Sequence, residues 1–276
     1  MVSMRNVARL VAVAVVGSLL PAAPAHAEYE PYDTRLVKTV INNGKPIAFG
    51  ASGSITVPVT VQIAEDSGGL ATVDAKLRSF GGLFFAYLDG PADHNMTCAP
   101  VPATMFTCTG AATFGMGYVD NTSAGLPVQL RLDGYAYDSG RYTLLSDPAE
   151  NVLLLKKAGL MAPEAGTGAV RKGGSLTITG KLTYPDWNRL EVGGNSYYSA
   201  AYAGQPVSLE FKKAGTTSYT RVGTVTSAAD GTVRTTVTAD ASGTWRWSFA
   251  GAGVVAASVS PDTSILVHDV RPGTRR

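Results

Sequence analysis

The chain has 276 residues, of which 45% are hydrophobic and 16% charged, and its formal net charge is +2. A clustered basic surface supplies most of the affinity of nucleic-acid-binding proteins, so a nearly neutral chain argues against that class. Two cysteines cannot complete the shell of a structural zinc site. The length suits one large domain or two small ones.

The first 27 residues have the organisation of a secretory signal peptide. Arg5 and Arg9 precede an apolar run over residues 10–20, and the small-residue motif Ala-His-Ala follows at 25–27. A positive head, an apolar middle and such a motif are typical of export signals. The run is shorter than the ~20 residues that a membrane-spanning helix needs, which argues against a retained anchor. We expect cleavage after Ala27 and an extracellular mature chain without a membrane span, released or loosely associated with the cell wall.

Apolar residues then recur at every second position, which is the pattern of half-buried strands. The clearest run is 55–63, where isoleucine and valine occupy alternate positions around Pro58. Proline donates no ladder hydrogen bond, so we expect this strand at a sheet edge or with the Pro58 nitrogen facing outward. Further strands are expected over residues 35–42, 73–78, 83–88, 106–114, 128–137 and 152–156.

The two cysteines, Cys98 and Cys108, flank a connection that ends on the strand expected at 106–114. In an exported chain this spacing favours a disulfide. The bond would close a small loop, and the chain-entropy model gives a stabilisation of about 2–3 kcal/mol.

The alternating pattern stops between residues 159 and 174, where proline and glycine crowd a stretch with almost no bulky side chain. Such a composition is typical of a linker or a domain boundary. We therefore expect an N-terminal domain over residues 28–158, a linker over 159–174, a C-terminal domain over 175–268 and a basic tail over 269–276. The two domains fall within the usual size range.

The second half again shows short alternating runs, with turn signals such as Asp230-Gly231 about every ten residues. Trp245, Trp247 and Phe249 share one face of such a run. We find no convincing amphipathic helix in the mature sequence. Several short strands with turns at this spacing predict an all-β sandwich or barrel. The strands expected in this half cover residues 175–182, 207–211, 233–237, 245–249 and 265–267.

Several motifs point to a known family. The second half contains Arg171-Lys-Gly-Gly174, Tyr202-Ala-Gly-Gln-Pro-Val-Ser-Leu-Glu-Phe211 and Trp245-Arg-Trp-Ser-Phe249, and the first contains Val40-Ile-Asn-Asn-Gly44. These motifs resemble small secreted proteins of high-GC Gram-positive bacteria with immunoglobulin-like modules, over nearly the whole mature chain and more closely in the second half. The resemblance implies two tandem immunoglobulin-like β-sandwich domains. Because many members are labelled calcium-binding proteins, it also implies calcium as the cofactor to test.

The chain departs from the family pattern around residues 166–168 and in extra residues before Tyr198. Calcium takes six to eight oxygen ligands, and the chain contains no EF-hand loop. In a sandwich, Glu65, Asp66 and Asp138 could meet at one end, with Asp147 and Glu150 supplying further oxygens. Aspartate also favours turns for local hydrogen-bonding reasons, so turn formation is the alternative explanation.

Segment 184–202 carries Trp187, Tyr197, Tyr198 and Tyr202 among small and polar residues. Aromatic rings stack on sugars, and a secreted protein meets cell-wall glycans, so these four are the candidate ligand-binding residues. Aromatic side chains also bury large areas, so the same residues could instead cover the end of the sandwich.

Catalytic motifs are weak in this sequence. The mature chain has two histidines, His94 and His268, and neither a nucleophile elbow nor a zinc-hydrolase motif occurs in a fitting context. A glycosidase with paired carboxylates is the remaining enzymatic alternative, and we expect no enzyme.

Three functions stay open: a calcium-stabilised surface protein, a binder of cell-wall polymer or of another secreted protein, and a spacer.

Overall fold

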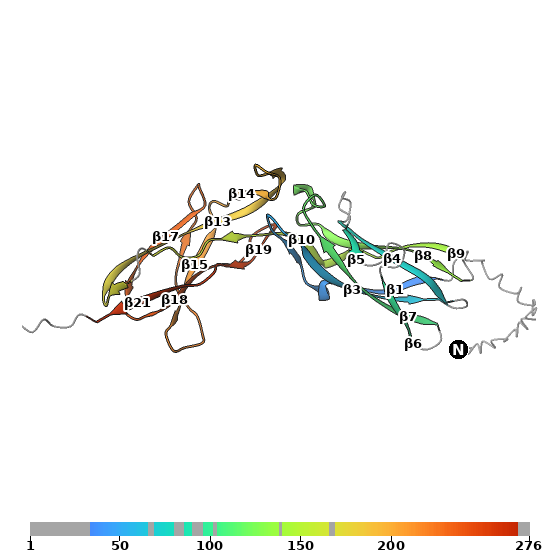
Figure 1. Cartoon of the computed structure of the whole chain (residues 1–276), viewed down its shortest axis with the longest axis horizontal. Helices are drawn as coiled ribbons and strands as arrows, with labels where there is room; N and C mark the ends of the chain where they lie inside the picture. The colour runs from blue at the N-terminus through green and yellow to red at the C-terminus, as the bar shows by residue number, and fades with distance from the viewer. Residues whose placement is uncertain are drawn as a thin grey trace, which may run out of the picture. The chain divides into compact units, whose positions relative to one another are not determined.

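The computed structural model describes residues 34–65, 69–79, 86–89, 96–101, 104–137, 140–165 and 169–269. These residues form tandem β-sandwiches, which confirms the all-β class (Figure 1). Within the described ranges there are two 3-10 turns, Asn42–Gly44 and Asn121–Ser123, and no α-helix. The expected signal peptide and the tail beyond residue 269 lie outside these ranges. No helix in the described part of the chain is long and apolar enough to cross a bilayer.

The described residues of the first half form ten strands in two layers. One layer has the order β1-β3-β7-β6, the other joins β4, β8, β9 and β10, and β5 pairs with both β4 and β7. The strands are β1 (Arg35–Ile41), β2 (Ile47–Phe49), β3 (Ile55–Ala64), β4 (Leu70–Ser79), β5 (Ala86–Asp89), β6 (Thr97–Val101), β7 (Met105–Phe114), β8 (Pro127–Ala136), β9 (Gly140–Leu145) and β10 (Ala149–Lys157).

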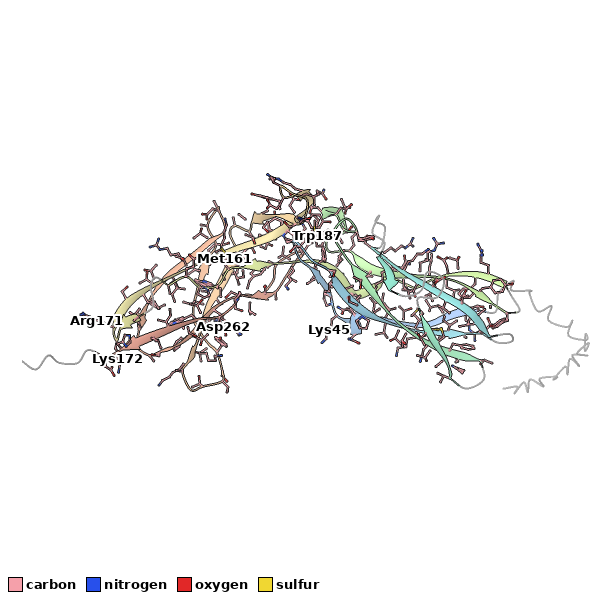
Figure 2. All side chains as sticks on the ribbon, in the orientation of Figure 1. Lys45, Met161, Arg171, Lys172, Trp187 and Asp262 are labelled. Carbon is pink, nitrogen blue, oxygen red and sulfur yellow. A yellow bond between two sulfur atoms is a disulfide. The ribbon has the colours of Figure 1, made fainter. Side chains whose placement is uncertain are left out.

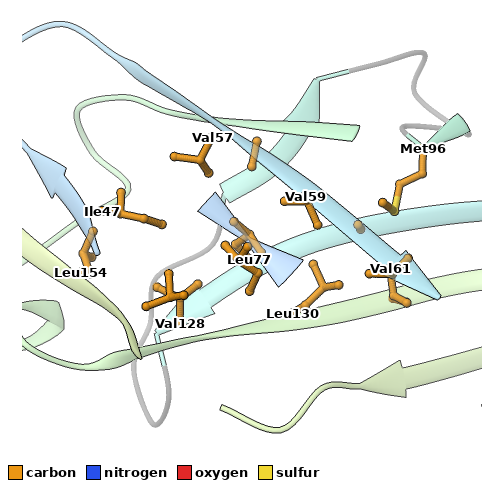
Figure 3. Close-up of a cluster of buried hydrophobic side chains, with 14 of the residues drawn as sticks. Ile47, Val57, Val59, Val61, Leu77, Met96, Val128, Leu130 and Leu154 are labelled. Atoms are coloured by element: carbon orange, nitrogen blue, oxygen red, sulfur yellow. The ribbon is translucent and has the colours of Figure 1, made fainter. Parts of the chain in front are cut away.

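The alternation in β3 places its branched aliphatic residues in the core of the first sandwich. Val57, Val59 and Val61 are each 1% exposed and face Leu77 and Leu130 from the opposite layer (Figure 3). Burying one such side chain contributes about 1.5–3 kcal/mol. This period-two pattern therefore accounts for both the strand and the side of it that is buried.

Pro58 shows why β3 can be a central strand despite its proline. β1 pairs with β3 only as far as Ile41 opposite Val59, and Pro58 is the next residue. On its other side Pro58 lies opposite Ala111 of β7. β3 is thus a central strand and not an edge strand, and Pro58 lies where β1 no longer pairs with it, as the alternative of an outward-facing Pro58 nitrogen allows.

Most strands of the second half form two smaller sheets, while β19 pairs in parallel with β10 of the first half. β13 pairs with β11, β14 and β17 in one sheet, and the other has the order β12-β21-β18-β15-β16, with β20 beside β18. The strands are β11 (Gly159–Leu160), β12 (Ala169–Arg171), β13 (Gly174–Leu190), β14 (Tyr197–Ala201), β15 (Pro206–Lys213), β16 (Thr220–Thr226), β17 (Thr232–Ala239), β18 (Gly243–Phe249), β19 (Val255–Ala256), β20 (Ser258–Val259) and β21 (Thr263–His268).

In both halves the chain forms a first strand in one sheet and then crosses to the other sheet for the next strand. In the first half, β1 is antiparallel to β3, and the chain then continues as β2, parallel to β10. In the second half, β11 is antiparallel to β13, and β12 is parallel to β21. The stretch expected to be a linker, 159–174, therefore contributes two strands to the second sandwich. Sequence periodicity missed them because strands of two and three residues are too short to show it.

The core of the second sandwich is centred on Trp247, which is fully buried. Its indole nitrogen donates a hydrogen bond to the Thr179 carbonyl at 3.2 Å. Gly180 allows this approach, because a β-carbon there would lie 2.5 Å from the indole nitrogen. Trp245 and Phe249 are 4% and 2% exposed, so all three aromatic residues of the β18 run face the core.

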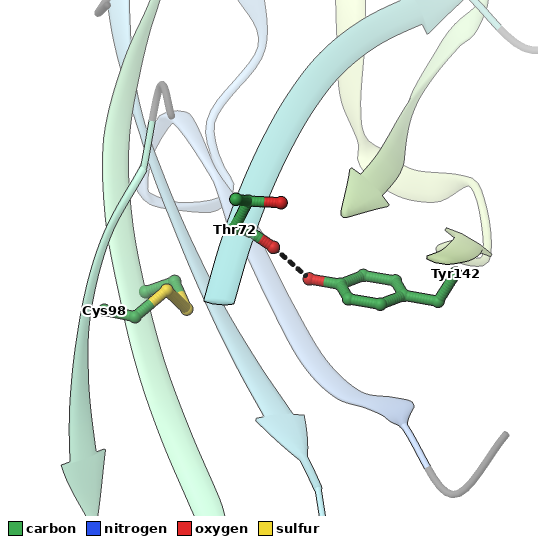
Figure 4. The surroundings of a disulfide bond; sticks show 4 residues. Thr72, Cys98 and Tyr142 are labelled. Carbon is green, nitrogen blue, oxygen red and sulfur yellow. Dashed lines mark hydrogen bonds between the residues drawn. A yellow bond between two sulfur atoms is a disulfide. The ribbon is translucent and has the colours of Figure 1, made fainter. Parts of the chain in front are cut away.

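The expected disulfide between Cys98 and Cys108 is present (Figure 4). The two residues are directly opposite each other on β6 and β7, so the bond links neighbouring antiparallel strands. It ties the short strand β6, which has no other partner among the described strands, to the sheet.

Replacing Trp247 by alanine should lower the free energy of unfolding by about 3–5 kcal/mol, because the change removes a buried aromatic ring and leaves a cavity. Urea denaturation measures the loss. Leu266→Ala is the control, since Leu266 is 60% exposed and should change stability by less than about 0.5 kcal/mol. Equal effects of the two substitutions would contradict the assignment of this core.

Candidate functional site

The candidate site is a β-hairpin that projects from the second sandwich. β13 continues past its pairing with β17 and turns back as β14, with Thr183 opposite Ala201 and Asp186 opposite Tyr198. The connection between the two strands contains Gly193 and Gly194, both at positive φ. Residues 184–202, expected to be a loop, therefore form mostly paired strands.

Trp187 and Tyr197 of this hairpin are buried against the first half of the chain. They are 2% and 3% exposed and belong to the core cluster that contains Ile47 and Phe49. The indole nitrogen of Trp187, labelled in Figure 2, donates to the Gly50 carbonyl at 3.4 Å. The ring centroid of Phe49 lies 6.2 Å from that of Trp187 and 6.5 Å from that of Tyr197.

The backbone and the phenol of Tyr197 both take part in this contact. Its backbone N–H donates to the Ala51 carbonyl at 2.6 Å. Its hydroxyl donates to the Val119 carbonyl at 3.2 Å and accepts from the Gly117 N–H at 2.8 Å. The hairpin is therefore held to two separate segments of the first sandwich through one residue.

Asn121 is the centre of a polar network beside these rings. Its amide nitrogen donates to Asp186 Oδ1 at 2.6 Å. Its amide oxygen accepts from Lys156 Nζ at 2.6 Å and from the Trp187 N–H at 3.0 Å. Its own backbone N–H donates to Asn188 Oδ1 at 2.9 Å. One asparagine side chain thus joins β10 to β13.

Lys156 is only 5% exposed, and its ammonium group lies 5.0 Å from the ring centroid of Tyr184 and 5.5 Å from that of Trp187. Burial lowers the pKa of this lysine, although the nearby charge of Asp186 acts in the opposite direction. The hydrogen bond from Asn121 is the largest influence on Asp186 and lowers the pKa of that carboxyl. The site therefore favours an ionised Asp186.

Sequence reasoning missed Asn121 and Lys156. Residues 152–155 are all apolar, so the sequence does not tell which face of β10 is buried; the structure shows that Val152, Leu154 and Lys156 share that face. A lysine on the buried side of a strand requires a partner for its charge. No comparable pattern surrounds Asn121, which lies in a 3-10 turn.

Of the four candidate aromatic residues, Tyr202 also packs. Its ring contacts Tyr184 and Phe249 at centroid distances of 5.1 and 5.7 Å, and its hydroxyl donates to the Ala252 carbonyl. Tyr198 is half-buried, with the Arg189 guanidinium 4.0 Å from its ring centroid. Trp187 and Tyr197 thus form the packed face of the hairpin, in agreement with the alternative that these aromatic residues pack, and ligand binding by the four residues stays a prediction.

Of the expected calcium ligands, Asp66 and Asp138 lie outside the described residues. Glu65 is 2% exposed and accepts a hydrogen bond from the Thr34 hydroxyl. Asp147 and Glu150 are exposed near the start of β10. Among the residues that the structure describes, no three His, Cys, Asp or Glu side chains are grouped to hold a metal ion. Calcium binding by this set stays a prediction.

No protein-family model and no curated protein sequence matches the chain. Three similar solved structures are the D0-D1 domain of intimin (15% identity, 84% of this chain, 98% of that chain, TM-score 0.26), the human OSCAR ligand-binding domain (14%, 84%, 100%, 0.25) and BcpA, the major pilin subunit of Bacillus cereus (10%, 85%, 69%, 0.25). TM-scores this low do not establish a shared fold, so the assignment of β-sandwiches rests on the strand pairing.

Asn121→Ala should lower the free energy of unfolding by about 1–3 kcal/mol, because it leaves the Lys156 ammonium and the Trp187 N–H without their acceptor. Urea denaturation would detect the loss. Asn195→Ala is the matched control, since Asn195 is exposed between β13 and β14 and should change stability by less than about 0.5 kcal/mol. A loss no larger than that of the control would mean that the network contributes nothing.

The stability contributed by Asp186 should depend on pH. Its folded-state pKa lies below the ordinary value. Its contribution is therefore present above about pH 4 and is lost as the pH falls through the folded-state pKa. Thermal melts at pH 7 and pH 3 should show Asp186→Asn less stable than the parent at pH 7, with a smaller difference at pH 3. Asp240→Asn, at an exposed position, is the control, and a difference independent of pH would contradict this role.

Proposed function

We propose that this chain is a non-catalytic structural module of the cell exterior, whose tandem sandwiches are coupled by the β13–β14 hairpin. The export signal predicted from the sequence pattern of the first 27 residues supports the extracellular assignment. The Cys98–Cys108 disulfide supports it as well, because disulfides persist in oxidising compartments.

The structural role is supported by how the candidate functional residues are used. Trp187, Tyr197 and Tyr202 all contribute ring contacts and hydrogen bonds to packing. Glu65 is likewise buried and hydrogen-bonded. These four candidates for a ligand platform or an ion site are thus engaged inside the fold, as expected of a module that transmits load or holds a spacing.

The single observation that carries the proposal is the hydrogen-bond network that joins Asn121 and Asp186 to the buried Lys156 beside Trp187. A flexible connection between two sandwiches would not require a buried lysine whose partners come from separate segments. Breaking the network leaves the buried Lys156 ammonium without its hydrogen-bond acceptor, and an unpaired buried charge is costly. Separation of the hairpin from the first half is therefore costly, and the two sandwiches should behave as one cooperative unit.

Calorimetry tests this coupling. The parent protein should unfold in one transition, because loss of either sandwich exposes the shared contact. Trp187→Ala should uncouple the halves and produce two transitions. Tyr198→Ala is the control on the same hairpin, since the Tyr198 ring contacts Arg189 and should leave one transition. Two separate transitions in the parent, or a single transition retained in Trp187→Ala, would refute the proposal.

A further inference from the structure

The outer face of β4, β8 and β9 carries a depression of about 430 Å³, within the size range of small-ligand sites. Polar and aromatic side chains line it, including Thr72, Asp74, Asp133, Tyr135, Arg141 and Thr143. We propose that this depression binds a sugar residue that carries one anionic group. The inference rests on the proposed extracellular role and adds a ligand class to it.

Strand register brings these residues together in two rows. Tyr135 of β8 lies opposite Thr72 of β4 and Arg141 of β9. Two residues along, Asp133 lies opposite Asp74 and Thr143. Alternate residues of a strand point to the same face and are about 6–7 Å apart. The two rows therefore lie side by side on one surface, at a spacing that a single sugar ring can bridge.

In the row of Thr72, Tyr135 and Arg141, an exposed aromatic ring lies beside an arginine that has no partner among the described residues. Tyr135 is 49% exposed. Arg141 is exposed, and within the described part of the chain its side chain makes no hydrogen bond or ion pair. Directly opposite residues on antiparallel strands have β-carbons about 4.5–5.5 Å apart, so the ring and the guanidinium can contact the same ligand. An arginine fork binds carboxylate and phosphate groups through two parallel hydrogen bonds.

The second row offers a fixed acceptor. Asp133 accepts hydrogen bonds from Arg131 Nε at 3.1 Å and from the Thr143 hydroxyl at 2.8 Å, and Lys76 Nζ lies 3.4 Å from it. Burial acts to raise the pKa of Asp133, but the hydrogen bonds from Arg131 and Thr143 outweigh it and lower the pKa. The carboxylate is thus held in place as an ionised acceptor for ligand hydroxyl groups.

The floor of the depression is rigid. Tyr142 is 2% exposed, and its hydroxyl donates to the Thr72 carbonyl at 2.9 Å (Figure 4). Gly134 makes room for this contact, because a β-carbon at that position would overlap both the Tyr142 hydroxyl and the Thr72 carbonyl. A rigid floor positions the residues above it before a ligand arrives, and preorganisation of this kind lowers the cost of binding.

The charges select the class of ligand. Lys76, Arg131 and Arg141 supply three positive groups beside the carboxylates of Asp74 and Asp133. A densely anionic polymer would be repelled by the carboxylates of Asp74 and Asp133. A neutral sugar would offer no charged group to the Arg141 guanidinium. A ring with several hydroxyl groups and one negative group matches the arrangement. The negative group can be the carboxylate of a uronic acid or the phosphate of a sugar phosphate.

Isothermal titration of the protein with galacturonate, mannose 6-phosphate and neutral maltotetraose tests the proposal and separates the two sources of charge. We expect binding of at least one anionic probe and at least tenfold weaker binding of maltotetraose. Arg141→Ala and Tyr135→Ala should each weaken binding of the anionic probe at least tenfold. Arg234→Ala and Tyr118→Ala are the controls, because both residues are exposed away from the depression.

Failure of both anionic probes to bind would overturn the proposal, as would unchanged affinity in Arg141→Ala or Tyr135→Ala. Arg141→Lys keeps the charge and should bind more tightly than Arg141→Ala, which separates loss of the cation from loss of folding. Absence of binding in a protein that still unfolds in one transition would remove the saccharide site and leave the structural role standing. The two proposals can therefore fail independently.

Discussion

The burial of Lys156 is the constraint on which the connection between the two sandwiches depends. An ammonium group removed from water is tolerated only where its charge is met by hydrogen bonds or opposite charge. Here the Asn121 amide oxygen accepts a hydrogen bond from Lys156 Nζ at 2.6 Å, and the ring centroids of Tyr184 and Trp187 lie within 5.5 Å of that nitrogen. These groups come from a 3-10 turn and from β13, so the lysine is satisfied only when both segments are in place.

The β13–β14 hairpin supplies the rings that cover Lys156, and its role therefore lies in packing. β13 is 17 residues long because its second part leaves the pairing with β17 and pairs with β14. Trp187 and Tyr197 then lie in the same core cluster as Phe49. Aromatic residues with a polar atom are suited to this position, because the ring buries apolar area while the N–H or O–H finds a carbonyl acceptor. The hairpin is therefore an element of packing, although its composition resembles that of a binding loop.

The outer face of the first sandwich is organised differently, with the same strands serving two purposes. β8 directs Val128, Leu130 and Leu132 into the core, each fully buried. Its intervening residues Arg131, Asp133 and Tyr135 line the depression on the opposite face. Rigid strands hold such a surface more accurately than loops do, because the core fixes each backbone position. One face of β8 thus contributes to the core, and the other face lines the proposed binding surface.

The sequence by itself determined the all-β class, most of the longer strands, the disulfide and the core role of Trp245, Trp247 and Phe249. Each of these depends on local information, either the period-two alternation of a strand or the pairing of two cysteines in an exported chain. Only the tertiary structure decided that residues 159–174 contain strands, that Trp187 and Tyr197 are buried, and that Asn121 meets Lys156. Alternation reports which side of a strand is apolar, but it does not report which surface lies opposite that side. Contacts between residues 65 or more positions apart, such as those of Asn121 with Asp186 and Trp187, exist only once both sandwiches have formed.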